Sequence, residues 1–585
     1  MCGIAGLMSR DGVTPDASML DRFARALGHR GPDGEGKYLV DPVAMVQTRL
    51  AIIDLKTGDQ PFFEPGGATL IANAEIYNFQ ELRAELTDVN FTSASDCELP
   101  LHLYRRDGLD FVNALRGMYA IAIHDPAESR LVLTRDPFGI KPLYYVETPN
   151  VFAFASEPHA LIDAGMTAPI LNERRRDEVL NLQFTCGRET IFQGVNRVLP
   201  GETLVVRGGH IVERRRRPAL PSGAPRLQSS ENALETLDAA LENSVMMHQR
   251  SDVPYGLFLS GGIDSSSLLT LMSRLNDTPV RAFTAGFGGT SVNDERDHAR
   301  MLAHSVGAEF HGVDFTEDDF WSLLPRIAAS IDDPAADYAV LPTWKLASVA
   351  AEELKVVLCG EGSDELFGGY GRYRSALRPW WLGGRTMRAR GVLDGLQVLR
   401  TESAGWRDEF AAAETMANTP ERTRLQIAQA TDIADWLPND LLTKLDRCLM
   451  AHGLEGRTPF LDSRISEAAF LLPDNLKIQK RQGKWLLRTW LENVMPKAKP
   501  FARKRGFTVP VGEWMNRRGA KLGELVAKSP AIRDICVAGE VQKLYTSEQK
   551  RPRLAGWNLL FYALWHRRHI EGLAPEGGVF DTLSA

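Results

Sequence analysis

Short apolar runs separated by turn-forming residues dominate the first third of the chain. Residues 49–54 and 116–125 read as strands, and residues 135–145 read as a turn followed by another strand. A polar loop at 73–78 leads into a helix at 79–86. Many short strands with only two or three helices predict a layered α+β domain.

Beyond residue 230 the pattern changes to alternating strands and helices. Residues 280–287, 310–315 and 355–359 are strand-like apolar runs, and residues 296–306 form a helix. An amphipathic helix precedes them, and its apolar face comprises Leu234, Leu237, Leu241 and Val245. The alternation predicts a parallel sheet flanked by helices, with ligands at the carboxyl ends of its strands.

The two patterns meet at a stretch rich in proline, glycine, serine and arginine. We therefore expect a first domain over residues 2–210, a linker over 211–230 and a second domain over 231–585. The part beyond about residue 520 is less informative, although residues 557–566 look helical and are expected to pack on the second domain.

Composition and charge are those of an ordinary soluble enzyme. The net charge of −7, from 68 basic and 75 acidic residues, argues against nucleic-acid or membrane-surface partners. No apolar run reaches the ~18–20 residues of a membrane span, and the start of the chain lacks the layout of a secretory signal. Six scattered cysteines without a Cys-x-x-Cys pair indicate neither a disulfide framework nor zinc. We expect a cytoplasmic protein, with a homodimer as the candidate assembly.

A glycine turn that could bind a ligand follows the apolar run at 257–259. The turn at 260–262 reads Ser-Gly-Gly, and a helix opens at 264–266. Glycines let the backbone approach an anion, and the first helical N–H groups point at it. The carboxylate of Asp264 would repel a bare phosphate, so we infer a metal ion between them. Hydroxyl donors are available from Ser260, Ser265 and Ser266.

This stretch has two alternative interpretations. A Walker-type loop needs Gly-Lys followed by Ser or Thr, but the Gly-Lys pairs at 36–37 and 483–484 precede aromatic residues. The other alternative is a turn that only connects strand to helix. The segment resembles the Ser-Gly-Gly-x-Asp-Ser loop of ATP pyrophosphatases, which cleave ATP between the α- and β-phosphates and form adenylates.

A second strand end is acidic. The run at 355–359 continues into a glycine-rich loop with Glu361, Asp364 and Glu365. Asp364 could join Asp264 in holding Mg²⁺ on a pyrophosphate, because hard cations prefer carboxylate oxygens. An acidic surface loop would fit this strand end poorly.

The chain begins Met1-Cys2-Gly3. Removal of the initiator methionine before a small residue would leave Cys2 with a thiol and an α-amine on one residue. That amine titrates near ~7.7–8.0 and can act as the general base for its own thiol.

Residues 2–205 resemble the class II glutamine amidotransferase domain, an N-terminal-nucleophile hydrolase with αββα layers. The matching blocks include Cys2 and residues 29–34, 49–54, 73–78 and 95–98. The resemblance implies that Cys2 attacks the glutamine side-chain amide and forms a thioester. The Asn73 side chain and the Ala74 N–H would stabilise the oxyanion, at roughly 3–4 kcal/mol for each donor.

The same resemblance implies a glutamine pocket. Arg49 would pair with the α-carboxylate of glutamine, while Glu75 and Asp96 would hold its α-ammonium. Asp96 is also well placed to start a helix as its cap. The backbone completing the pocket comprises Arg49, Leu50, Ala51, Ile52 and Ile53. The family usually has glycine where this chain has Ala74; if that position required a positive φ, alanine would cost about 1 kcal/mol.

Residues 230–520 look like the synthetase domain of the glutamine-hydrolysing asparagine synthetase family. The matching blocks are residues 260–266, 360–370, 444–462, 483–488 and 503–510. The resemblance implies an α/β ATP-pyrophosphatase domain, with Glu361 forming or using a β-aspartyl-adenylate and Lys484 stabilising its charge or that of pyrophosphate. Residues expected at ATP or pyrophosphate are Leu259, Ser260, Gly261, Gly262, Asp264, Ser265, Ser266, Ala285, Cys359 and Gly360. Serine and valine are usual at positions 359 and 285.

The resemblances imply an enzyme that uses ATP with Mg²⁺, aspartate and glutamine and releases asparagine. One alternative keeps both sites but amidates another carboxylate, in a peptide, an antibiotic or a polysaccharide precursor. A non-catalytic protein on the same scaffold is the other alternative, and the presence of Cys2, Asp264, Glu361, Asp364 and Lys484 argues against it.

Overall fold

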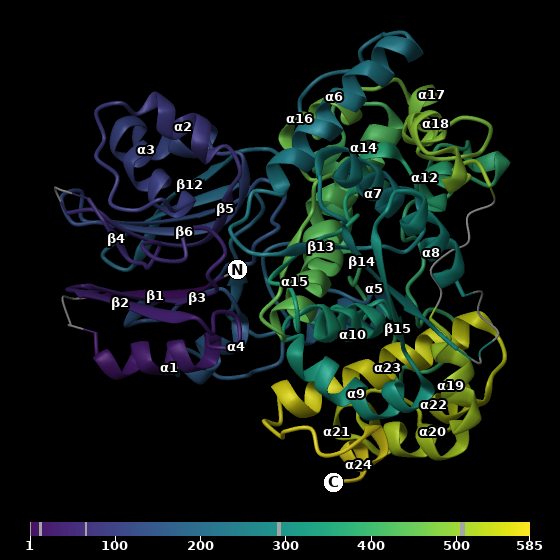
Figure 1. Ribbon diagram of the computed structural model, residues 1–585. Coiled ribbons are helices and arrows are strands. Elements are labelled where there is room, and N and C mark those ends of the chain that lie inside the picture. The colour runs from purple at the N-terminus through teal and green to yellow at the C-terminus, as the bar shows by residue number, and fades with distance from the viewer. Residues whose placement is uncertain (1, 11–14, 65–66, 289, 291–293, 503–508) are drawn as a thin grey trace.

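The computed structural model describes residues 2–10, 15–64, 67–288, 290, 294–502 and 509–585. Figure 1 shows two stacked sheets in purple and blue beside a larger teal and green body, with yellow C-terminal helices along one end of that body.

Two six-stranded antiparallel sheets form the first unit. The first sheet has the order β10-β8-β9-β1-β3-β2, and the second has the order β12-β11-β7-β6-β5-β4. The strands of the first are Asn196–Arg197, Tyr144–Glu147, Val151–Ala155, Gly3–Ser9, Val43–Arg49 and Gly34–Val40. Those of the second are His210–Arg216, Glu202–Arg207, Arg130–Arg135, Gly117–Asp125, Thr69–Ile76 and Phe62–Phe63.

Helices cover the outer faces of this pair of sheets, as Figure 1 shows. Helices α1 (Ala17–Leu27) and α4 (Pro158–Asp163) lie on one side, and α2 (Phe79–Glu85) and α3 (Leu99–Asp107) on the other. Strand β1 shows why: Ile4 and Met8 join the core between the sheets, whereas Ala5 and Leu7 join the core under α1. Successive side chains of a strand point to opposite faces, so a strand buried on both faces needs a covering layer on each side. This confirms the predicted αββα architecture.

Two local predictions for the first unit were wrong. Strand β3 ends at Arg49 instead of beginning there, and residues 50–54 form a loop. The polar residues 73–76 belong to strand β5, which pairs with β6 along its length, and do not form a loop. At β5, pairing with β6 overrides the local polar pattern. At residues 50–54 the apolar side chains of Leu50 and Ile52 are buried against the second unit and not in a sheet.

The first unit also reaches further along the chain than residue 210. Strand β12 pairs with β11 as far as Arg216, which lies opposite Glu202. It therefore occupies the start of the stretch that we expected to be a linker. Its side chains are mostly exposed, which is why an edge strand read as a solvated connector.

A five-stranded parallel sheet forms the centre of the second unit, in the order β15-β14-β13-β16-β17. Its strands are Glu309–Asp314, Arg281–Gly286, Tyr255–Phe258, Val356–Leu358 and Glu455–Arg457. Helices α6 (Ser230–His248), α7 (Ile263–Leu275) and α8 (Arg296–Ser305) occupy the predicted positions. The predicted parallel α/β sheet is confirmed.

The C-terminal helix α23 (Lys550–His569) contacts both units. It runs along α9 (Glu317–Ser330), and the side chain of Asn558 donates to the carbonyls of Val179 and Leu180 on α5 (Glu173–Leu182). The tail therefore packs on the second unit, as expected, and on a helix of the first unit as well.

Two whole-chain expectations can be compared with the structure. All six cysteines are free and buried. Within the ranges that the structure describes, every helix is too short or too polar to cross a membrane.

Candidate active sites

Cys2 directly precedes β1 of the first sheet and lies next to β5 of the second. Its backbone N–H donates to Asn73 Oδ1 across 3.1 Å, which joins β1 of one sheet to β5 of the other. Asn73 is fully buried, and its Nδ2 makes no hydrogen bond with any described residue. Burial raises the pKa of the Cys2 thiol. The site thus holds a protonated thiol beside an amide N–H group that lacks an acceptor.

Ala74 lies on β5 in extended backbone, opposite Tyr119 of β6. It is not among the residues with positive φ. The anticipated cost of alanine at this position therefore does not arise, because an extended strand accepts any side chain.

The side chain of Arg49 lies under the loop of residues 50–54. Its guanidinium pairs with Asp59 Oδ1 at 2.6 Å and donates to the carbonyl of Asp54. Asp252, just before β13, holds this loop from the other unit by accepting from Asp54 N at 2.7 Å. Leu50 and Ile52 are buried in the apolar core of the second unit. The loop expected to border glutamine is therefore fixed by both units.

Glu75 forms an ion pair with the second unit. Its carboxylate lies 2.8 Å from Arg457 Nη2, and Arg457 also pairs with Glu455 at 2.6 Å. Arg457 ends β17, and its carbonyl accepts from Cys359 N at 2.8 Å. Arg457 thus connects Glu75 of the first unit to Cys359, which follows β16.

Asp96 does not cap a helix. Ser95 caps the 3₁₀ helix η1 (Asp96–Glu98), while the Asp96 carboxylate accepts from Ile76 N at 2.7 Å. Burial raises the pKa of Asp96 to about 6. The Asp96 side chain therefore bonds the end of β5, the strand that carries Asn73 and Glu75.

A cavity of about 270 Å³ opens at the carboxyl ends of β13, β14 and β16. Seven of the ten residues expected at ATP line it: Leu259, Ser260, Asp264, Ser265, Ala285, Cys359 and Gly360. Ser266 is fully buried on α7 and does not line the cavity, and neither do Gly261 and Gly262. Gly261 instead has a φ of +71°, which lets the chain turn from β13 into α7.

The two expected metal ligands converge on one cation. Lys484 Nζ lies 2.7 Å from Asp264 Oδ1 and 2.8 Å from Asp364 Oδ1. Lys484 itself is 3% exposed and has a φ of +58° at the start of α18 (Trp485–Val494). A non-glycine residue held in this region marks a constrained site. Within the described residues, no group of three or more His, Cys, Asp and Glu side chains could hold a metal ion.

Glu361 lines the same cavity and has a lysine as neighbour. Its Oε1 lies 3.7 Å from the Nζ of Lys444 on α15 (Leu442–Met450). Lys444 was not among the expected site residues, although its block was recognised. Of the cationic blocks expected near the phosphates, residues 503–508 lie outside the described ranges.

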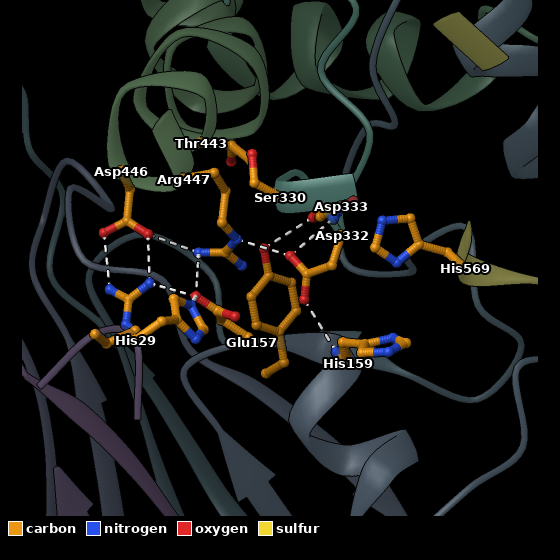
Figure 2. Close-up of polar contacts among 12 residues, drawn as sticks. His29, Glu157, His159, Ser330, Asp332, Asp333, Thr443, Asp446, Arg447 and His569 are labelled. Atoms are coloured by element: carbon orange, nitrogen blue, oxygen red, sulfur yellow. Dashed lines mark hydrogen bonds and ion pairs between the residues drawn. The ribbon is translucent and has the colours of Figure 1, made fainter. Parts of the chain in front are cut away.

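A buried network of charges joins the two units next to Cys2. Arg30 donates from Nε to the Cys2 carbonyl and binds both carboxylate oxygens of Asp446, at 2.8 and 2.9 Å. Figure 2 shows Asp446, Arg447, Glu157 and Asp332 linked in one group. Arg447 lies 2.6 Å from Asp446 and 2.7 Å from Asp332. Burial opposes ionisation of Glu157, yet His29, Arg447 and Arg30 hold its pKa well below its usual range.

Family models match both units. The asparagine synthase model matches residues 236–567, more than half of the chain, and the glutamine amidotransferase domain model matches residues 1–216. The chain belongs to the asparagine synthase family. The predicted family is therefore confirmed.

Individual relatives agree over the whole length. The chain is 30% identical to "Asparagine synthetase [glutamine-hydrolyzing] 1" of Bacillus subtilis, over 98% of this chain and 97% of the relative. A second B. subtilis protein of that description, numbered 2, is 29% identical over 85% of this chain and 70% of its own length. "Amidase chry2" of Gibberella zeae is 32% identical, over 64% of this chain and 60% of that protein.

Sequence reasoning missed the residues that link the sites. Arg457, Asp446 and Arg447 lie in blocks that were recognised, but nothing local indicates that they reach the glutamine side. The separation of Arg30 from Asp446 is 416 residues. The usable signal was the presence of charged residues inside an otherwise apolar segment, because buried charges are normally paired.

Proposed function

We propose that the protein is a glutamine-dependent asparagine synthetase, which converts ATP, aspartate, glutamine and water to AMP, pyrophosphate, asparagine and glutamate. The observation that carries this proposal is one chain with a buried Cys2–Asn73 site and a nucleotide cavity where Asp264 and Asp364 converge. The two-domain division of labour, with the boundary after β12, is part of the proposal.

At the first site, the Cys2 thiol attacks the side-chain carbonyl carbon of glutamine, and its proton passes to the α-amine of Cys2. The unpartnered Nδ2 of Asn73 supports its assignment as an oxyanion donor, together with the N–H of Ala74. The intermediate collapses to a thioester and ammonia, and water then hydrolyses the thioester to glutamate.

The α-groups of glutamine are held by three charged residues. Arg49 already pairs with the exposed carboxylate of Asp59, which supports a carboxylate-binding role in which the substrate replaces Asp59. Glu75 and Asp96 take the α-ammonium, with Arg457 fixing the orientation of Glu75. The backbone of residues 50–53 closes the pocket.

At the second site, the β-carboxylate of aspartate attacks the α-phosphorus of ATP and pyrophosphate leaves. Asp264 and Asp364 fit a Mg²⁺ ion, because both reach one point now taken by the ammonium of Lys484. Mg²⁺ would neutralise the charge of the pyrophosphate. Lys484 stabilises the negative charge of the leaving group, and Ser260 and Ser265 donate to phosphate oxygens.

Ammonia then attacks the acyl carbon of the β-aspartyl-adenylate, and AMP leaves. Glu361 accepts the proton that the attacking nitrogen loses. Ammonia must travel inside the protein, because ammonia released into water becomes ammonium, which is not a nucleophile. The charged network of Arg30, Asp446 and Arg447 lies between the two units and keeps them in contact.

The decisive experiment compares nitrogen sources in wild type and Cys2→Ala. With ATP, Mg²⁺ and aspartate, the variant should lose glutamine-dependent asparagine formation and retain ammonia-dependent formation. Loss of both activities would contradict the two-site scheme. Pyrophosphate release with other carboxylic acids, but none with aspartate, would instead favour an amidotransferase for another acceptor. The mass of the mature N-terminus shows whether Met1 has been removed.

A further inference from the structure

Lys444 is a buried cation whose side chain makes no hydrogen bond with any residue that the structure describes. It is 5% exposed, lies on α15, and lines the nucleotide cavity beside Glu361. Its one short contact among the described residues is the ion pair with Glu361 at 3.7 Å, beyond hydrogen-bond distance. A buried ammonium that faces a cavity and makes no hydrogen bond is poised to bind an anion.

The strand order separates Lys444 from β14, which carries Ala285, one of the residues expected at ATP. Phe283 and Ala285 lie on β14, whereas Glu361 follows β16, two strands away in the order β14-β13-β16-β17. Lys444 reaches Glu361 from α15, which leads into β17. In the proposed reaction the phosphates have Lys484 as their cation, so Lys444 is available for another anion.

Three acids act on Lys444 electrostatically, and of these only Glu361 forms an ion pair with it among the described residues. Asp337, Glu361 and Asp440 together raise the pKa of Lys444 although burial opposes this, so the lysine is charged. Asp440 is 1% exposed, and neither of its carboxylate oxygens makes a hydrogen bond with a described residue. It is the penultimate residue of the π-helix η4 (Asp432–Leu441), a geometry common at functional sites. Burial raises the pKa of Asp440 to about 8, so this carboxyl is protonated at neutral pH and does not neutralise Lys444.

We propose that Lys444 binds the α-carboxylate of the amino-acid acceptor while the side-chain carboxylate of that acceptor is activated. The inference rests on the proposed function and adds the residue that recognises the acceptor. The α-carboxylate must be free, so an acceptor whose α-carboxylate is part of a peptide bond does not fit.

The test measures ATP- and Mg²⁺-dependent pyrophosphate release with aspartate and with its α-amide, isoasparagine. The wild type should prefer aspartate, with a kcat/KM about 10- to 100-fold higher, the range expected for one charge-assisted hydrogen bond. Lys444→Met should lower kcat/KM for aspartate and abolish this preference, while Lys444→Arg should retain part of it. Lys528→Met, at an exposed lysine on α20 (Gly519–Lys528), is the matched control and should leave the preference intact.

The preference is a ratio, so general damage to the variant cancels. If Lys444→Met raises the KM for ATP and leaves the preference unchanged, Lys444 binds phosphate and the proposal is overturned. If circular dichroism shows that Lys444→Met does not fold, the test rests on wild type and Lys444→Arg. Equal use of aspartate and isoasparagine by the wild type then overturns the proposal. If aspartate is inert and another amino acid is active, the proposed function fails. The role of Lys444 is then tested with that amino acid and its α-amide.

Discussion

At the scale of single residues, burial determines the chemistry of the proposed glutamine site. Burial raises the pKa of the Cys2 thiol, so the thiol requires a base before it can attack. Burial also raises the pKa of Asp96 to about 6. Motif positions identified both residues, but their protonation follows from the cores that enclose them.

Asp96 predicts a pH dependence of glutamine hydrolysis. Asp96 must be ionised to hold an ammonium, so kcat/KM for glutamine should fall as the pH drops through about 6. Stability changes in the opposite direction: because the folded pKa is raised, the contribution of Asp96 is present below its unfolded value and is lost as the pH rises through about 6.

Initial rates of glutamate formation across this range measure the first effect. Asp96→Asn should bind glutamine weakly and lack the acidic limb. If the limb persists in the variant with the same midpoint, another group is responsible.

At the scale of elements, strand ends and the loops that follow them build the nucleotide site. The Ser-Gly-Gly turn and helix α7 follow directly from an apolar run, a glycine with positive φ and a helix start, all local in sequence. The strand β5 was misread because its polar residues face a buried site. Periodicity reports which side chains are apolar, and it fails where a strand carries functional polar groups.

Gly369 gives an element-scale prediction. A Cβ at this position would lie 1.8 Å from Asp364 Oδ1 and 2.4 Å from Lys484 Cε. Gly369→Ala should therefore displace the pair of aspartates and reduce pyrophosphate release by at least about 100-fold, equivalent to roughly 3 kcal/mol, while glutamine hydrolysis persists.

The neighbouring variant Gly371→Ala is its control. A Cβ there would meet only Arg374 Nη2, at an ordinary 3.5 Å, so activity should be retained. Equal activity of the two alanine variants would show that the loop moves freely and that close packing at Gly369 is unimportant.

At the scale of the whole molecule, buried ion pairs hold the two units together. Arg447 is 1% exposed and pairs with Asp446 and Asp332, and Asp446 in turn binds Arg30 of the other unit. Breaking such a pair leaves charges buried without a partner, which is far more costly than losing an exposed pair. The tail helix α23 adds a second, mostly apolar connection through α5.

Arg447→Met should therefore lower the free energy of unfolding by about 3–5 kcal/mol. Calorimetry should show a lower melting temperature. Because the network couples the two units, their unfolding should also separate into two transitions. Arg274→Met, which removes the exposed pairs to Asp238 and Glu242, should cost less than about 1 kcal/mol. Similar losses in both variants would contradict the role of the buried network.

The amino-acid sequence by itself determined both fold classes and the order of the two units, because these depend on short motifs and local burial patterns. It identified Cys2, Asn73, Asp264 and Asp364 individually. Only the tertiary structure brought Glu75 to Arg457, Arg30 to Asp446 and Lys444 to Glu361. These pairs join segments that are far apart in the chain. Their contacts depend on how the two units pack together, and local backbone preferences carry no information about that packing.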